Sequence, residues 1–450
     1  MKKQSEYNIL TAISMIIGIV IGSGIFFKSD DVLNYTNGSV ALGILVFVIA
    51  GISIIFGSLT IAQIAIRTDK AGGIVTYMEE VGNTSLAGSL GWFHTFIYYP
   101  TLIVVVSWVA GVYFCLLFGM EGTLLHQCSI GFTFTIFFFI MNIISKRMGG
   151  YFQVATTIIK LIPLFLIAVL GLMFGETSNI TLEPVIATTS SMGFIAAIVP
   201  IAFSFDGWII ATSMSHEIKN SKKNLPIALI ISPLFIVCIY SLYLVGISAL
   251  LGADQVIALG DSHVDVACNM LFGANGAKIM LVFIVISVLG TVNGLILGAI
   301  RLPYGLALRN MLPGSNKLKE VNETYDIPVN SALLSFGLAV GWYIVHYLVM
   351  NYALMGGSDI SEIAIVMNYV CYILLYLGVI GLYRKKEITS FKTGVINPVL
   401  ATIGSLIIFA GSLIVFGEDG LSLNIKVLVF MGVSLAVLVT AYLYCNKQAE

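Results

Sequence analysis

Twelve apolar stretches, each long enough to cross a lipid bilayer, occupy most of this chain of 450 residues. A helix needs about 20 residues to cross a hydrocarbon core of roughly 30 Å. With 58% hydrophobic and only 10% charged residues, the chain is too apolar for a water-soluble fold. We therefore predict an all-α membrane protein with twelve transmembrane helices. The predicted spans are 8–27, 39–66, 76–118, 128–145, 151–174, 191–215, 226–251, 273–301, 328–351, 360–383, 395–416 and 423–445.

The basic residues predict the orientation, because Lys and Arg in short loops stay cytoplasmic. If the N-terminus is inside, all but four of the 22 Lys and Arg residues fall on the cytoplasmic side. The exceptions are Lys28, Lys278 and Lys426 on the outer side and Lys160 within a span. We therefore expect a multi-pass protein of the cell membrane, in contact with lipid, with both termini cytoplasmic. Nucleic acid is not expected as a partner, because the basic residues lie in short loops rather than on one face.

The first apolar stretch is interrupted by Ile21-Gly22-Ser23-Gly24-Ile25-Phe26. Inside a membrane every backbone amide must be satisfied, so unwound backbone is tolerated only where it faces protein, water or ligand. The glycines therefore predict a broken first helix whose break forms the floor of a binding site. The alternative is a close-packing face of small residues between helices.

The sixth stretch carries the second interruption, in Pro200 to Trp208. Spans one and six are five apart, and a five-span unit begins and ends on opposite sides, so a second copy must be inverted. We predict a first repeat over 1–174, with its break near 22–24, and a second over 191–383, with its break near 204–207. Residues 395–450 then hold spans eleven and twelve and a cytoplasmic C-terminus.

The two breaks offer opposite chemistry. Freed amides of Ser23, Gly24 and Ile25 at a positive helix end suit a carboxylate. Freed carbonyls around Phe203 and Ser204 are acceptors for an ammonium group. A site with amide donors on one side and carbonyl acceptors on the other fits the carboxylate and ammonium ends of a zwitterion.

Lys160 lies about ten residues into span five, roughly 15 Å deep at 1.5 Å per residue. Its charge needs an internal partner, because an idle charge at that depth costs about 2.5 to 3.5 kcal/mol. We expect its ammonium to bind the freed carbonyls of the first helix, in the place of a sodium ion, or to carry a proton. A structural tie between helices is the alternative.

Three further positions in the spans are candidates for the site. Asp206 could receive a substrate amine, pair across the pocket, or cap the second half-helix. Phe203 and Phe205 flank the second break, and we expect Phe203 to act as a gate. Asn293 in span eight is either a polar group of the pocket or a hydrogen-bonding link between helices.

Three motifs, in the right order, resemble those of the amino acid, polyamine and organocation permeases. The segment from Ile21 to Phe26 resembles their GSGIF signature. Phe203 to Trp208, followed by Glu217 to Pro226, is similar to their sixth span and the next loop, especially in the L-type and bacterial exchanger branch. Gly290 to Gly294, followed by Arg301 and Arg309 to Pro313, resembles their eighth span and exit loop.

The resemblance covers nearly the whole chain and implies a LeuT-like fold of five plus five inverted helices with two extra helices. It implies a substrate carboxylate on the amides of Ser23 to Ile25 and an amine on carbonyls near Ile21 and Phe203. Phe203 matches an aromatic lid, and Lys160 matches a lysine that replaces a sodium ion. The chain departs from the family at Asn310, where many relatives carry an aspartate, and at Ile209, where some L-type relatives carry a polar residue.

We therefore expect a sodium-independent carrier of small or medium neutral L-amino acids. It should work by alternating access as an exchanger, and a monomer is sufficient for this mechanism. Proton-coupled uptake is the main alternative, since a buried lysine can lose its proton. Uptake of cationic amino acids or polyamines and a receptor that binds without transport are further alternatives. No cofactor, metal site or enzyme activity is expected, because the five histidines lie on separate segments without ligand spacing.

Overall fold

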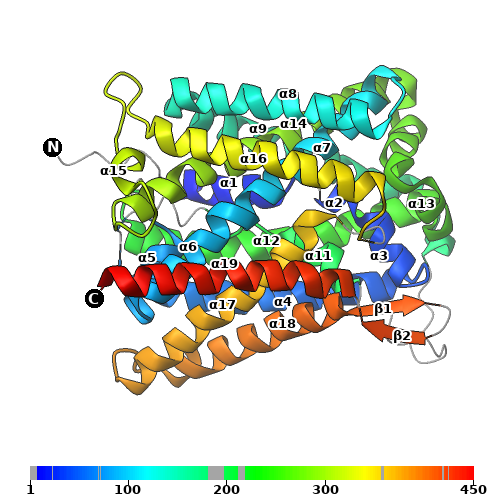
Figure 1. Cartoon of the computed structure of the whole chain (residues 1–450). Coiled ribbons are helices and arrows are strands. Elements are labelled where there is room, and N and C mark those ends of the chain that lie inside the picture. The colour runs from blue at the N-terminus through cyan, green and yellow to red at the C-terminus, as the bar shows by residue number, and fades with distance from the viewer. Residues whose placement is uncertain are drawn as a thin grey trace.

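The computed structural model describes residues 8–22, 24–68, 70, 72–180, 197–210, 218–355, 359–417, 420–423 and 425–449. Within these residues, eleven helical segments are long and apolar enough to cross a membrane. Most of the long helices lie roughly side by side along one axis of the molecule (Figure 1). Of the predicted sixth span, 191–215, only 197–210 is described. The prediction of a helical, multi-pass membrane protein is confirmed.

The helices and strands follow one another in a simple order. The α-helices are α1 (Ile9–Val20), α2 (Gly24–Phe27), α3 (Ser29–Tyr35), α4 (Val40–Ala65), α5 (Ile74–Val81), α6 (Thr84–Phe93), α7 (Tyr99–Phe118), α8 (Leu124–Ile144), α9 (Lys146–Phe174), α11 (Ile198–Phe205), α12 (Ser221–Leu251), α13 (Ala253–Leu259), α14 (His263–Ala307), α15 (Ser315–Leu318), α16 (Val329–Asn351), α17 (Ile360–Arg384), α18 (Asn397–Leu413) and α19 (Ile425–Ala449). The π-helices are η1 (His94–Tyr98) and η5 (Lys392–Ile396), the 3₁₀ helices η2 (Thr177–Asn179) and η4 (Gly260–Ser262), and the strands β1 (Ile414–Gly417) and β2 (Gly420–Leu423).

Several helices begin at a polar residue whose side chain accepts a hydrogen bond from a free amide of the first turn. Ser39 caps α4, Asn83 caps α6 and Thr123 caps α8 in this way. Asp359 caps α17 by accepting from two amides. The apolar runs therefore give the helices their length, and short polar residues fix where these helices start.

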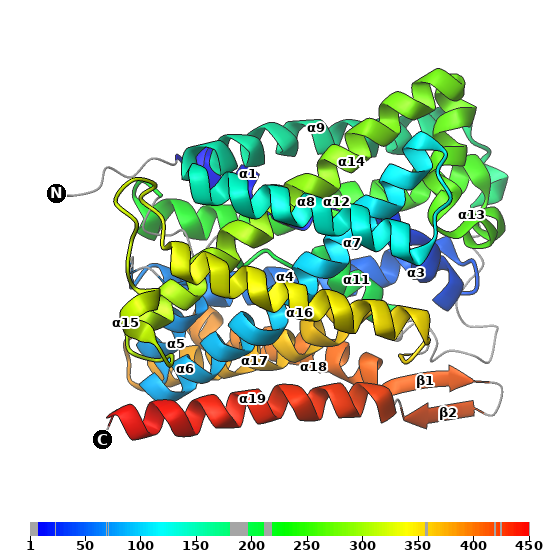
Figure 2. The same cartoon turned by 45° about the horizontal axis from the view of Figure 1, so that its top comes forward.

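Two predicted spans differ in shape from single straight helices. The stretch 76–118 divides into the short helix α5 and the continuous run α6, η1 and α7, with Asn83 between them. The stretch 273–301 is part of the longer α14, which contains Gly273 in a non-helical conformation at φ 68°. The purely helical prediction also missed the antiparallel hairpin β1–β2 between α18 and α19 (Figure 2).

The two broken segments pack in corresponding ways. Helix α1 lies against α9, α12 and α14, and α11 lies against α4 and α17. In a five-helix inverted repeat, α9 corresponds to α17 and α12 to α4. The contacts favour that repeat, which stays a prediction.

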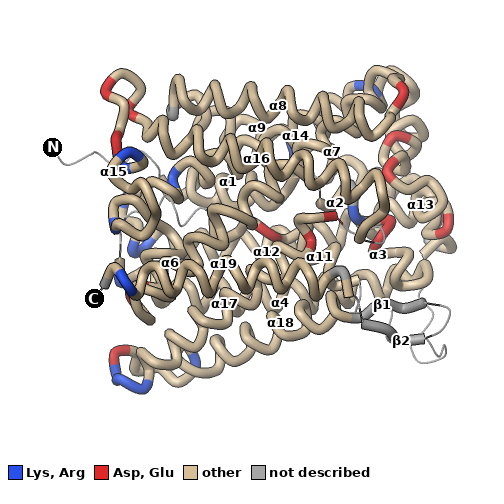
Figure 3. Tube along the Cα trace, in the orientation of Figure 1, with Lys and Arg blue, Asp and Glu red and all other residues tan. Residues whose placement is uncertain are grey.

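Charged residues gather at the two ends of the helix bundle. Lys and Arg are concentrated at the end where α15 lies and α19 finishes, whereas acidic residues are prominent at the opposite end, along α3 and α13 (Figure 3). The middle of the bundle carries few charges, which makes Lys160, Asp206 and Glu362 conspicuous.

Candidate functional site

The first interruption lies between α1 and α2. Helix α1 ends at Val20, and Ile21 is extended at φ -74° and ψ 98°. Helix α2 begins at Gly24. Ser23 is outside the described residues, so the predicted role of its amide is not placed.

The second interruption follows α11. Asp206 is extended at ψ 160°, and Gly207 has φ +94°, a left-handed conformation that side chains rarely adopt. A Cβ atom on Gly207 would lie 2.7 Å from Cγ2 of Ile19 in α1. A glycine is therefore required here both for the backbone conformation and for the contact with the first broken helix.

The glycines of the first break also permit close contact between the two breaks. A Cβ atom on Gly24 would lie 2.5 Å from the backbone Cα of Ser204, and one on Gly22 would lie 2.3 Å from Oγ1 of Thr291. The close packing considered as the alternative is thus present together with the unwound backbone.

A cavity with about 320 Å³ of empty space lies between the two interruptions. Both breaks contribute backbone to its wall, and α7 and α14 contribute side chains. The lining residues are Ile19, Val20, Gly22, Gly24, Leu102, Val106, Phe203, Asp206, Gly207, Thr291 and Leu295.

Lys160 reaches from α9 to the carbonyl end of α1. The side chain is fully buried, and Nζ donates to the Gly18 carbonyl at 2.5 Å. Nζ also lies 3.4 Å from Oγ1 of Thr291. Because α1 stops two residues later, the Gly18 carbonyl belongs to its last turn, where carbonyls lack helical partners. The ammonium therefore caps the broken end of α1.

Tyr240 of α12 joins the two interruptions. Its hydroxyl lies 3.2 Å from the Val20 carbonyl and 3.0 Å from the Ser204 carbonyl, so it can donate to either. The side chain is fully buried. Sequence reasoning missed this residue, since a tyrosine in an apolar span gives no sign of which helix it faces.

Asp206 faces the cavity from the second break. Tyr98 donates its hydroxyl to Oδ2 at 2.5 Å, while Oδ1 is buried without a hydrogen-bond partner among the described residues. Tyr98 belongs to η1, a π-helical turn of a kind often found at functional sites. Next to it, His94 contacts the Asn368 amide oxygen at 2.8 Å. The rings of His94 and Tyr98 are in contact, with centroids 4.6 Å apart, so polar side chains of η1 and α17 lie behind Asp206.

The aromatic residues of the second break divide into two roles. Phe203 lines the cavity, and its role as a gate stays a prediction. Phe205 does not line it. Its ring packs edge-on against Phe47 and in a tilted arrangement against Tyr240, at centroid distances of 6.0 and 5.2 Å. The position of Phe205 supports a packing role.

Some predicted site residues lie behind the cavity wall. The side chain of Ser204 donates to the Pro200 carbonyl at 3.0 Å. The Ile25 carbonyl accepts from Ser29 at 2.5 Å, and the Ile21 carbonyl lies 3.5 Å from the Thr291 hydroxyl. These residues shape the breaks from outside the lining.

Asn293 is separated from the cavity and links three helices. Its amide nitrogen donates to the Gly149 carbonyl at 2.9 Å and to the Gln153 side chain at 3.2 Å. Its amide oxygen accepts from Asn142 at 2.9 Å. These contacts correspond to the linking role considered as the alternative, and the cavity lining does not include Asn293.

The exit loop forms an ion pair with α5. Arg309 donates to Glu79 at 2.7 Å and to the Thr76 hydroxyl at 2.8 Å. Asn310 is in a left-handed conformation at φ 55°. Arg309 thus pairs with Glu79 of α5 in a chain that has Asn310 as the next residue. Glu217, in the loop motif after the sixth span, is outside the described residues.

Comparison with known proteins gives a consistent result. A family model described as amino acid permease matches residues 7–441. The serine/threonine exchanger SteT of Bacillus subtilis (strain 168) is 33% identical over 431 residues, which cover 95% of this chain and 94% of the exchanger. The b(0,+)-type amino acid transporter 1 of Homo sapiens is 24% identical over 421 residues, 91% and 83% of the two chains. The Asc-type amino acid transporter 1 of Homo sapiens is 26% identical over 431 residues, which cover 92% of this chain and 77% of the transporter.

The matches extend from before α1 into α19 and include both interruptions and the cavity between them. The residues that line the cavity are therefore part of the matched region rather than an addition to it. This protein belongs to the amino acid permease family and is a multi-pass membrane transporter of amino acids.

Proposed function

We propose that this protein exchanges small neutral L-amino acids across the cell membrane without sodium, by alternating access to the cavity between the two helix breaks. The observation that carries the proposal is the Lys160 ammonium on the Gly18 carbonyl. It puts an amino group at the carbonyl end of α1, the place suited to a cation in broken-helix transporters. When protonated, Lys160 would supply the positive charge that a sodium ion would otherwise provide there.

The zwitterionic ends of the substrate would bind to the two breaks. Its carboxylate would accept from the amides of Gly24 and Ile25, and from that of Ser23, at the start of α2. Its ammonium would approach carbonyls of the unwound segments near Ile21 and Phe203. Each carbonyl has two lone pairs, so the Phe203 carbonyl, which accepts from the Asp206 amide at 3.1 Å, can accept a second bond.

The rest of the lining favours a short, uncharged side chain. Leu102, Val106 and Leu295 give the cavity an apolar wall, and Asp206 is the single carboxylate among its described lining residues. One oxygen of Asp206 is already occupied by Tyr98, and the other can accept from a hydroxyl group. The similarity to a serine/threonine exchanger supports serine-sized substrates.

The orientation follows from the distribution of charge. We propose that the end carrying α15 and the end of α19 is cytoplasmic, because Lys and Arg gather there (Figure 3). The end carrying α3 and α13 would then face outward.

Transport in proteoliposomes tests the proposal. Labelled L-serine should enter vesicles preloaded with unlabelled L-serine in sodium-free buffer, and should not enter empty vesicles. A panel of competing amino acids should show stronger inhibition by small neutral side chains than by lysine or glutamate.

The same vesicles test the main alternative. Lys160 is fully buried, an observation that also suits a group that carries a proton. Uptake into empty vesicles driven by a proton gradient would replace exchange with proton coupling. Binding of L-serine without any flux would instead indicate a receptor.

A further inference from the structure

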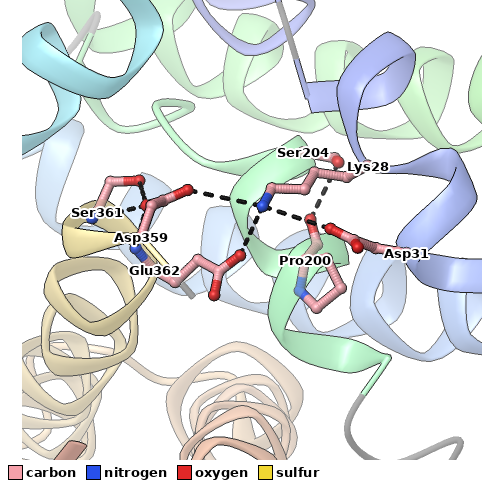
Figure 4. Close-up of polar contacts among 7 residues, drawn as sticks. All are labelled: Lys28, Asp31, Pro200, Ser204, Asp359, Ser361 and Glu362. Atoms are coloured by element: carbon pink, nitrogen blue, oxygen red, sulfur yellow. Dashed lines mark hydrogen bonds and ion pairs between the residues drawn. The ribbon is translucent and has the colours of Figure 1, made fainter. Parts of the chain in front are cut away.

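Lys28 lies beside the second break at the end of the molecule opposite to that of α15. It connects α2 to α3, is only 5% exposed, and Nζ donates to Oε1 of Glu362 at 2.7 Å. Oδ2 of Asp359 is 3.6 Å from Nζ, and Oδ2 of Asp31 is 3.4 Å away. The ammonium therefore lies among three carboxylates, two of which come from α17 and its cap (Figure 4).

The carboxylate of Asp359 is held in place independently of Lys28. Oδ1 of Asp359 accepts from the amides of Ser361 at 2.8 Å and Glu362 at 3.2 Å, which fixes the start of α17. Glu362 lies in the first turn and is 7% exposed. The link from Lys28 thus joins the first broken segment to the beginning of a long helix.

Lys28 also contacts the residue expected to act as the gate. Its Nζ lies 5.6 Å from the centroid of the Phe203 ring, within the range of a cation–π contact. Phe203 lines the cavity, whereas Lys28 does not. The ring is therefore in contact both with the cavity and with the charged cluster.

We infer that Lys28 is a positioning residue for the outer gate: by linking Glu362 of α17 to the Phe203 ring, it holds the gate closed over the cavity. This role rests on the proposed transport function. When α2 and α17 separate, the link breaks and Phe203 loses its cation.

The physical chemistry of a buried ion pair suits a link that must open. Removing charges from water carries a large desolvation penalty, so such pairs often contribute little to folding stability. Water that enters on opening would hydrate Lys28 and the three carboxylates and recover much of that penalty. An apolar seal of the same size would gain no comparable hydration.

Access to the cavity from the outer side tests this role. Val106 lines the cavity on α7, and Val106→Cys in a background without the six native cysteines provides a reporter for a membrane-impermeant thiol reagent. We expect Lys28→Met and Glu362→Gln each to raise the outside labelling rate about tenfold, because each removes a charge-assisted hydrogen bond. Lys28→Arg keeps the charge and should retain slow labelling.

A matched control comes from the opposite end of the protein. Arg67 and Glu387 form an ion pair at 2.9 Å there, and Glu387→Gln should leave the outside labelling of Val106→Cys unchanged. A protein that retains only the buried Cys445 reports on misfolding, because its labelling in detergent should stay slow in both gate variants.

Unchanged labelling in Lys28→Met and Glu362→Gln would overturn the gate role. An equal rise in the labelling rate of Glu387→Gln would also overturn the gate role. Labelling does not require flux, so a failure of the exchange proposal is recognised separately, by the absence of serine exchange in the wild-type protein.

Discussion

Replacing Lys160 separates a functional cation from a structural link. In Lys160→Met the stem of the side chain is kept and the ammonium is lost. The Gly18 carbonyl, now 2.5 Å from Nζ, then loses its charged donor at the broken end of α1. Lys160→Ala removes the stem as well and leaves a cavity, so Met is the cleaner change.

The expected size of the effect follows from that one hydrogen bond. A hydrogen bond to a charged group contributes about 1.5 to 3 kcal/mol. At about 1.4 kcal/mol for each factor of ten, its loss from the arrangement that holds the first break should lower the exchange rate roughly ten- to 150-fold. Folding stability should behave differently, because replacing a buried charge with a well-packed apolar side chain is often neutral or stabilising.

Two measurements on the same preparation check this prediction. Initial rates of serine exchange should fall at least about tenfold in Lys160→Met, while the thermal unfolding midpoint in detergent stays equal or rises. A lower midpoint combined with near-normal exchange would refute the reasoning and assign Lys160 a purely structural role. Adding sodium should not restore exchange in Lys160→Met.

Three further predictions concern residues around the breaks. Tyr240→Phe removes the hydroxyl that contacts carbonyls of both breaks, and a loss of about 1 kcal/mol should raise the KM for serine roughly fivefold in concentration-dependent uptake. Gly207→Ala should reduce exchange by more than about tenfold, because the left-handed backbone and the close contact with α1 exclude a side chain; Gly337→Ala, with open space around it, is the control and should leave exchange unchanged. Burial raises the pKa of Asp30 to about 7 from its ordinary value of 3.8, so the folded protein holds the proton more tightly than the unfolded chain does. The stabilisation by Asp30→Asn should therefore grow as pH rises from about 4 to about 7 and then level off, and a thermal unfolding midpoint shift that is independent of pH would contradict this.

The sequence contained strong signals for the transmembrane helices and the interruptions. Lipid forces long apolar runs to become helices, and a glycine pair or a buried aspartate stands out within such runs. In the structure, α1 ends at Val20 and α11 at Phe205, next to those signals. The hairpin β1–β2 was missed, because a short apolar segment between two spans does not distinguish a strand from a loop.

The membrane class, the family resemblance and the positions of the unusual residues along the chain could all be predicted from the amino-acid sequence. The packing of the helices was needed to establish that Thr291 and Val106 face the cavity, that Tyr240 joins the two breaks, and that Lys28 meets Glu362 from a distant helix. In a soluble helix the polar face marks the side away from the core. A membrane helix is apolar towards both lipid and protein, so its rotation, and with it the set of side chains that meet, is fixed only by packing against its neighbours.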